Sequence, residues 1–230
     1  MTDSQLAETT AQILLDTDCV LFRPQEPFFF SSGWASPVFV DVKRLISYPL
    51  ARNTLIELAV QKVLATLGYQ AFDVIAGGEV AGIPFAAMVA DRLNLPLVVV
   101  RRQAMGYGPK AQLEGHLEPG KRVLMVEDLT TDGRTKGVFC DGLRRAGARV
   151  SDAFVIFKYG IFDVVVRDLD ARGVTLFSLA TWDDVIRVAH RRGALDGETL
   201  KKIEGYIADP IAWSEAHGGA GPAAAAGSAA

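Results

Sequence analysis

The spacing of apolar residues along the chain changes near Pro49. Beyond this residue, short apolar runs alternate with segments in which apolar residues recur at helical intervals. The expected strands cover residues 72–76, 95–101, 122–128, 148–157 and 174–180, and the expected helices cover residues 49–67, 83–93, 135–146, 164–171, 181–193 and 197–209. Strands that alternate with helices predict an α/β fold, in which helices cover both faces of a mostly parallel sheet.

Both ends of the chain depart from this alternation. We expect an amphipathic helix over residues 4–19, followed by an aromatic stretch and a strand that begins at Pro37. These features predict a small N-terminal unit over residues 1–45 and a main domain over residues 46–215. The last residues are rich in glycine and alanine and carry no charge, so we expect residues 216–230 to be disordered.

The composition excludes several classes of protein. Half of the residues are hydrophobic, which is enough to build a sizeable core and excludes a disordered chain or a disulfide scaffold. The chain has 24 basic and 27 acidic residues, and a net charge of −3 is unlike that of a general nucleic-acid binder. Two isolated cysteines and three scattered histidines predict no structural metal site. Without a signal-like or membrane-spanning apolar run, we expect a cytoplasmic protein that binds neither nucleic acid nor membrane.

One long segment interrupts the α/β pattern. Residues 102–121 read RQAMGYGPKAQLEGHLEPGK and contain four glycines and two prolines. A loop of this length within a compact α/β domain usually has a function. The alternative is an insertion without a role, and the spacing of residues does not decide between the two.

The segment VLMVEDLTTDGRTK, residues 123–136, carries the most chemistry. Its apolar start predicts a buried parallel strand, and Glu127 and Asp128 lie at the carboxyl end of that strand, where ligands bind in open α/β sheets. A turn rich in threonine and glycine then leads into a helix. The backbone amides of such a turn, together with the helix N-terminus, form a binding site for a phosphate group.

Three threonines can add donors to this phosphate site. They are Thr130, Thr131 and Thr135. Carboxylates beside a phosphate site suit a ligand that also carries hydroxyl groups, as a ribose phosphate does. The alternative is a helix N-cap rich in aspartate and threonine, which explains the threonines but not two carboxylates on a hydrophobic strand.

Four segments together resemble one enzyme family. The segment at 123–136 resembles the signature of the type I phosphoribosyltransferases, which bind phosphoribosyl pyrophosphate (PRPP). The wider resemblance is to the orotate phosphoribosyltransferase family in its alphaproteobacterial form, and it extends from about residue 20 to residue 215. The segments that carry it are FFFSSGWASPVFVDVKRLISYP, FDVIAGGEVAGIPFAAMVADRL, VVRRQAMGYGPKAQLEGH and VEDLTTDGRTK. This resemblance implies the type I phosphoribosyltransferase fold, which is Rossmann-like, with a small N-terminal hood.

The resemblance also implies a set of PRPP-binding residues. These are Arg101, Arg102, Tyr107, Glu127, Asp128, Leu129, Thr130, Thr131, Asp132, Gly133, Arg134 and Thr135. Glu127 and Asp128 would hold the ribose hydroxyls, and residues 131–135 would surround the 5′-phosphate. Thr131 and Lys158 would bind orotate, and the hood at residues 1–45 would cover this base.

Catalysis is implied to depend on a mobile loop. Residues 102–115 match the loop that closes over the site of the partner subunit in a homodimer, and residues 77–81 match a turn that faces the pyrophosphate. The resemblance implies Arg102 and Asp128 as catalytic residues, and Lys110 of the same loop is a further candidate.

The implied reaction transfers ribose 5-phosphate from PRPP to orotate and belongs to pyrimidine (UMP) biosynthesis. It gives orotidine 5′-monophosphate and pyrophosphate. Its transition state resembles an oxocarbenium ion, so loop cations and Mg²⁺ would stabilise the departing pyrophosphate. No side chain is expected to bind the metal alone; PRPP would hold it near Asp128.

This sequence departs from the family pattern at two important positions. The lysine of the catalytic loop is replaced by Met105, and Arg134 stands in the phosphate turn where the family has a smaller residue. Lys110 could supply the missing cation from the same loop; the alternative is that Lys110 is a solvated surface charge. The alternative is a divergent PRPP-binding paralogue that has weak activity, uses another base or acts as a sensor.

Overall fold

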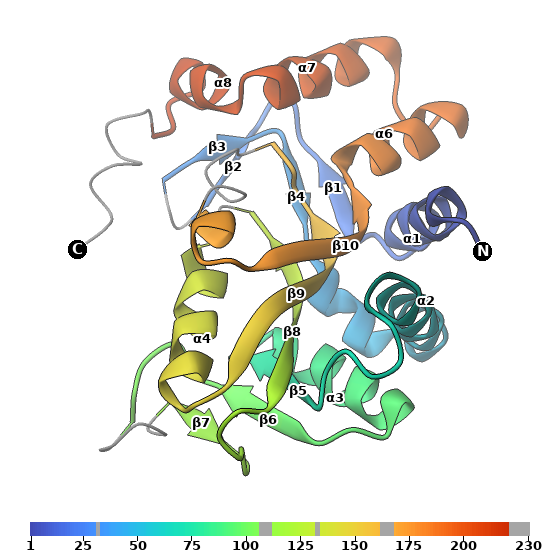
Figure 1. Ribbon diagram of the computed structural model, residues 1–230. Helices are drawn as coiled ribbons and strands as arrows, with labels where there is room; N and C mark the ends of the chain where they lie inside the picture. Colours follow the sequence, from blue (N-terminus) through green and yellow to red (C-terminus); the bar gives the residue numbers. More distant parts are fainter. Residues whose placement is uncertain (31–32, 106–111, 132–133, 162–167, 221–230) are drawn as a thin grey trace.

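A six-stranded sheet lies at the centre of the computed structural model, which describes residues 1–30, 33–105, 112–131, 134–161 and 168–220 (Figure 1). The strand order is β10-β9-β8-β5-β6-β7, and every neighbouring pair is parallel except β6 and β7. The strands are β5 (Val74–Gly78), β6 (Leu97–Val100), β7 (Leu113–Glu114), β8 (Arg122–Thr130), β9 (Arg149–Lys158) and β10 (Thr175–Thr181). The prediction of an α/β fold with a mostly parallel sheet is therefore confirmed.

Alternate residues of β8 belong to two different cores. Leu124 and Val126 pack in the larger core with α1 (Asp3–Asp16), α2 (Pro49–Leu67) and α3 (Gly82–Leu93), whereas Val123 and Met125 pack in a smaller core with α4 (Arg134–Arg145). Figure 1 shows α2 and α3 on one face of the sheet and α4 on the other. Successive side chains of a strand point to opposite faces, so a run of apolar residues is what a strand covered on both sides needs.

Short antiparallel strands of the N-terminal region lie at the carboxyl end of the sheet. β1 (Val20–Phe22) pairs with β4 (Val38–Val40), and β2 (Phe28–Phe29) pairs with β3 (Ala35–Ser36). The amide of Val40 donates to the hydroxyl of Tyr159, just beyond the end of β9, at 3.2 Å. A 3-10 helix, η1 (Val42–Ser47), then leads into α2. Because Leu14 and Val38 belong to the same core as Leu124, the first 45 residues share a core with the sheet.

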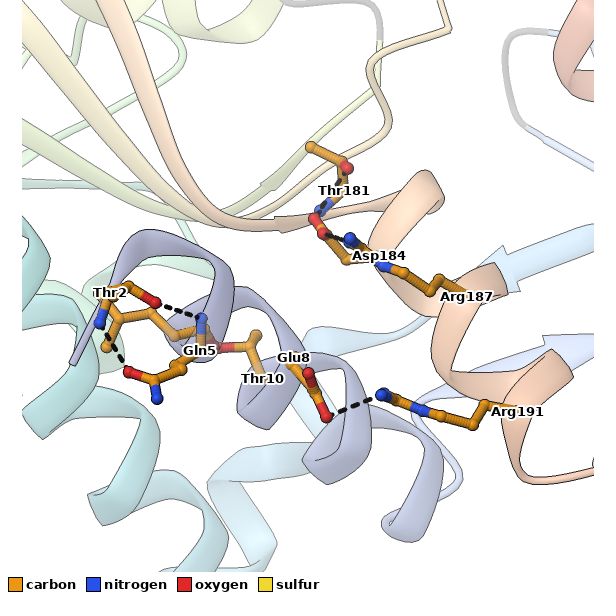
Figure 2. Close-up of polar contacts among 9 residues, drawn as sticks. Thr2, Gln5, Glu8, Thr10, Thr181, Asp184, Arg187 and Arg191 are labelled. Carbon is orange, nitrogen blue, oxygen red and sulfur yellow. Dashed lines mark hydrogen bonds and ion pairs between the residues drawn. The ribbon is translucent and has the colours of Figure 1, made fainter.

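Reciprocal caps define the beginnings of two helices that pack together, α1 and α6 (Trp182–Arg191) (Figure 2). The Gln5 amide donates to the Thr2 hydroxyl at 3.3 Å, while the Gln5 side chain accepts from the Thr2 amide at 2.8 Å. The amide of Thr181 donates to Asp184 in the same way, at 2.9 Å. These bonds satisfy amides that a helix start leaves unpaired. An ion pair between Glu8 and Arg191, at 2.8 Å, joins the two helices.

The C-terminal part of the chain differs from the prediction. Within the described residues, α6 is followed by α7 (Gly197–Ala208) and by a further short helix, α8 (Pro210–Ala216), where the sequence predicted two closing helices in all. The expectation of disorder from residue 216 is wrong for residues 216–220. There the amide of Ala220 donates to the carbonyl of Gly33 at 2.7 Å, and the Ser214 hydroxyl donates to the Ala220 carbonyl at 2.9 Å.

Two predicted features lie partly or wholly outside the described residues. These are the short helix at residues 164–171 and the end of the C-terminal tail, residues 221–230. Among the helices that the structure describes, none combines the length and the apolar character that crossing a bilayer requires.

Candidate active site

The predicted site residues gather where parallel strands end. Thr130, the last residue of β8, lies opposite Lys158, the last residue of β9, and Lys158 lies opposite Thr181 of β10. Glu127 and Asp128 precede Thr130 on β8, the strand between β9 and β5. The structure thus brings the carboxylates, Thr130 and Lys158 to one edge of the sheet, which is where ligands bind in this class of fold.

Glu127 and Asp128 are both almost completely buried. The exposed fraction of Glu127 is 4% and that of Asp128 is 5%. Burial raises the pKa of both carboxyl groups above its ordinary value, because a charged carboxylate loses hydration. The Lys136 ammonium opposes this effect at both residues. Two adjacent buried carboxylates are costly to a fold, so their presence marks a functional site.

Two glycines make room for the carboxylate of Glu127. A Cβ atom at Gly78, the last residue of β5, or at Gly82, the first residue of α3, would overlap Oε1 of Glu127. At Gly82 the same Cβ would also lie 2.9 Å from the carbonyl oxygen of Val126. Only glycine allows this close approach of backbone and carboxylate. Gly78 and Gly82 of the segment GGEVAG therefore leave the space that the Glu127 side chain of β8 occupies.

Lys136 is a site residue that the sequence reasoning missed. Its Nζ atom lies 2.9 Å from Oε2 of Glu127, and the exposed fractions of the two side chains are 10% and 5%. Lys136 lies in the first turn of α4, where the helix dipole disfavours a positive charge. A lysine in such a position, shortly after two buried acidic residues, is the signal that could have identified it.

The phosphate turn is described in part. Thr130 is buried, and its hydroxyl makes no hydrogen bond with any residue that the structure describes. Leu129, Thr131 and Thr135 are half-buried, and α4 begins at Arg134 as the turn requires. Asp132 and Gly133 lie outside the described residues.

The base of the predicted catalytic loop is held to the sheet. The amide of Arg102 donates to Oε2 of Glu79 at 3.0 Å. The amide group of Gln112 donates to the carbonyls of Arg101 and Arg102 at 3.2 and 3.3 Å, and its oxygen accepts from Arg145. Both ends of the loop are therefore fixed at the end of β6. Tyr107 and Lys110, which lie between them in the sequence, are outside the described residues.

Arg101 and Arg102 have different surroundings. The guanidinium of Arg101 pairs with Glu114 of β7 at 2.6 Å and donates to the sulfur of Met105 at 3.4 Å. Arg102 is exposed and lines an open depression of about 430 Å³. The other residues of its lining are Glu79, Val80, Gln103, Ala104 and Met105. Gly77 and Gly78 of the predicted turn at residues 77–81 lie in β5, and Glu79 and Val80 after them share one surface with Arg102, whereas the Arg101 side chain is engaged in an ion pair.

The model of the phosphoribosyl transferase domain family matches residues 46–176 of this chain. The chain, with its sheet edge and buried carboxylates, is therefore a member of the phosphoribosyl transferase domain family. The orotate phosphoribosyltransferase of Cereibacter sphaeroides is 48% identical over 95% of this chain and 94% of its own length. That of Sinorhizobium fredii is 44% identical over 96% and 95%.

A solved structure agrees with these two relatives. The crystal structure of orotate phosphoribosyltransferase from Aeropyrum pernix is 28% identical, with a TM-score of 0.66 over 80% of this chain and 99% of that one. The chain belongs to the orotate phosphoribosyltransferase family. The fold and the family that the sequence motifs implied are thereby confirmed.

Proposed function

We propose that this chain transfers the 5-phosphoribosyl group from PRPP to orotate at the carboxyl edge of its sheet. In this reaction a ring nitrogen of orotate displaces pyrophosphate from the anomeric carbon of PRPP. The observation that carries the proposal is the pair of buried carboxylates, Glu127 and Asp128, directly before the turn that begins α4. Family membership supplies the substrates, and the site supplies donors and acceptors that suit a ribose phosphate.

The ribose and the 5′-phosphate of PRPP are assigned to the two ends of this segment. Glu127 and Asp128 accept hydrogen bonds from the ribose hydroxyls. Residues 131–135 and the N-terminus of α4 bind the 5′-phosphate, because free backbone amides and the helix dipole both favour an anion there. The unpaired hydroxyl of Thr130 supplies a further donor at the same edge.

Charge on the departing pyrophosphate has to be stabilised as the bond to the anomeric carbon breaks. Arg102 lines the open depression beside the turn at residues 77–81, and we assign the pyrophosphate to this surface. Lys110 of the same loop is assigned as a second cation, in place of the family lysine at Met105. Preorganised cations aimed at developing charge are commonly the largest contribution to such a reaction.

Orotate is assigned to the neighbouring strand ends. Lys158 lies beside Thr130 in the register of β8 and β9, so its ammonium can face the carboxylate of the base. Thr131, the residue that follows the end of β8, is half-buried at the same edge. The antiparallel strands β1–β4 lie above these strand ends and supply a cover for the base.

Mg²⁺ fits this site only together with PRPP. In the part of the chain that the structure describes, no group of three or more histidine, cysteine, aspartate or glutamate side chains could hold a metal ion. Mg²⁺ commonly binds through one or two carboxylates and substrate phosphates. Asp128 can supply one such carboxylate, and the pyrophosphate of PRPP the remaining oxygens. When bound, the metal would neutralise charge on the pyrophosphate.

A homodimer, in which the loop of one subunit acts in the site of the other, completes the proposal. Three exposed apolar side chains where η1 leads into α2 support an interface there: Ile46, Tyr48 and Leu50, of which Leu50 is 84% exposed. Light scattering is expected to give twice the chain mass of 24.8 kDa. A monomer at assay concentrations would contradict this part of the proposal.

The activity is tested with purified protein, orotate, PRPP and Mg²⁺ by following the loss of orotate absorbance. We expect a turnover of at least roughly 1 s⁻¹, the low end of typical enzyme rates. Reactions without PRPP or without metal are the controls. If calorimetry detects PRPP binding and no orotate is consumed, the chain is instead a divergent paralogue with another base or a sensor role.

A further inference from the structure

Lys136 has no role in the proposed function so far, although it lies inside the site. It is the third residue of α4 and is 8% exposed, and its one ion-pair partner among the described residues is Glu127. A buried lysine near a helix N-terminus is unfavourable twice, through lost hydration and through the helix dipole. The contact with Glu127, at 2.9 Å, is what compensates for this placement.

The carboxylate of Glu127 is held from two sides. Lys136 binds Oε2, and the backbone at Gly78 and Gly82 packs against Oε1, where any Cβ atom would overlap it. Phe139, one turn further along α4, closes the same space, because a Cβ at Gly78 would also overlap its ring. The direction of this carboxylate is therefore set by β5, α3 and α4 together.

Lys136 also connects two parts of the ligand site. The residue before it, Thr135, belongs to the turn assigned to the 5′-phosphate, and its partner, Glu127, belongs to the ribose site. We propose that Lys136 is a positioning residue that fixes Glu127 for the ribose hydroxyls and ties it to the helix start that binds the 5′-phosphate. This inference rests on the proposed function, since it assigns a task within the same site.

The test uses two ligands that occupy different parts of the site. Ribose 5-phosphate carries the hydroxyls and the 5′-phosphate, whereas inorganic pyrophosphate carries neither. For Lys136→Met we expect calorimetry to give ribose 5-phosphate binding weaker by about tenfold to a hundredfold, the range of a lost hydrogen bond to a charged group. Pyrophosphate, measured with Mg²⁺, is expected to bind as in the unmodified chain.

Lys202→Met is the matched control. Lys202 pairs with Glu198 at 2.8 Å on α7, and the exposed fractions of these side chains are 38% and 76%. Its removal breaks a lysine–glutamate pair of similar length that lies within another helix and is exposed, and exposed pairs contribute little. Both ligands are expected to bind this variant unchanged.

A double-mutant cycle with Glu127→Gln separates positioning from direct contact. If Lys136 acts through Glu127, then Lys136→Met in the Glu127→Gln background costs less than threefold in ribose 5-phosphate binding. An undiminished cost there would mean that Lys136 contacts the ligand itself, and this would overturn the proposal. An unchanged affinity of the single variant, or equal losses for both ligands, would overturn it as well.

Two further measurements keep the outcome decisive. If Lys136→Met does not fold, Lys136→Gln takes its place, since its amide can still donate a hydrogen bond to Glu127, and it is expected to keep more affinity for ribose 5-phosphate than Lys136→Ala. Failure of the proposed function would look different. The unmodified chain would then consume no orotate; if it also bound no ribose 5-phosphate, both proposals would fall together, whereas loss of the Lys136 inference alone leaves that binding and the turnover intact.

Discussion

Strand β8 carries an ion pair near each of its ends, and the two pairs have opposite properties. At its first residue, Arg122 binds Asp73 through two guanidinium contacts of 2.6 and 3.1 Å and through its own amide at 2.9 Å. The exposed fractions there are 46% and 32%. Toward the other end, Lys136 and Glu127 form a pair whose exposed fractions are 10% and 5%.

The pKa values of the two carboxylates shift in opposite directions. Hydrogen bonds from Arg122 hold the pKa of Asp73 well below its usual range, so the fold favours the ionised form. Burial raises the pKa of Glu127 in spite of Lys136, so the fold disfavours the ionised form. One end of the strand thus contributes stability, while the other spends stability to keep charged groups ready for a ligand.

The largest expected effect comes from Asp128→Asn. The amide has the size of the carboxylate but is a weaker acceptor for a ribose hydroxyl, so we expect kcat/KM for PRPP to fall by about 10² or more. The melting temperature at pH 7 is expected to stay or rise, because a buried carboxyl group whose pKa is raised no longer has to ionise. Steady-state kinetics and calorimetric melting check the two parts. A lower melting temperature with full activity would mean that Asp128 stabilises the fold and is not needed for the reaction, and this would contradict the contrast between the two ends of β8.

A smaller effect is expected from Gly82→Ala, which fills part of the space that the Glu127 carboxylate occupies. The new Cβ would overlap Oε1 and lie 2.9 Å from the carbonyl of Val126, so we expect a loss of about 1–3 kcal/mol in the free energy of unfolding. The KM for PRPP is expected to rise about tenfold.

The control for this substitution is Gly205→Ala in α7, where, apart from the adjacent residues and the nearby backbone of α7 itself, no atom of the described residues lies within 4 Å of the added Cβ. It should stabilise the chain by roughly 0.5–1 kcal/mol without changing KM, since alanine is the better helix former. Equal changes in the free energy of unfolding and in KM for the two variants would show that the position of Glu127 does not depend on the space beside Gly82.

The smallest effect is expected from Asp73→Asn, and it depends on pH. The pKa of Asp73 is lower in the folded chain than in the unfolded chain, so its contribution to stability is complete above about pH 5 and is lost progressively as the pH falls below about 4 toward the lowered pKa of the folded chain. We therefore expect Asp73→Asn to lower the melting temperature at pH 7 and to lower it by less at pH 3. Turnover should be unchanged. A destabilisation that is equal at both pH values would contradict the assigned cause.

Most of the fold could be predicted because periodicity records which faces are buried. The helices α2 and α4 and the strands β9 and β10 begin and end within two residues of the expected positions. Strand β5, in contrast, extends two residues beyond its expected end, because Gly77 and Gly78 still pair with β6 although they resemble a turn. α8 was not predicted, because seven residues are too few to show a helical periodicity, although Asp209 caps this helix and Pro210 begins it.

The candidate site was predictable where one segment contains it. Glu127, Asp128 and the turn after them lie within ten residues, so their proximity is recorded in the sequence. The contact between Lys136 and Glu127 depends on how α4 packs on the sheet, and the ion pair of Arg101 with Glu114 depends on how β7 returns beside β6. Neither relation appears in local spacing. The roles assigned to the individual residues stay predictions.

A contact between the β2–β3 region and the segment at and after α8 can form only late in the synthesis of the chain. The hydroxyl of Ser214 accepts from the amide of Ala35, 179 residues earlier, and the amide of Ala220 binds the carbonyl of Gly33. At roughly 5–20 residues per second, a ribosome needs on the order of ten to forty seconds to make the intervening chain. The hairpin of β2 and β3 is among the first parts to be synthesised, but its contacts with Ser214 and Ala220 are among the last that can form.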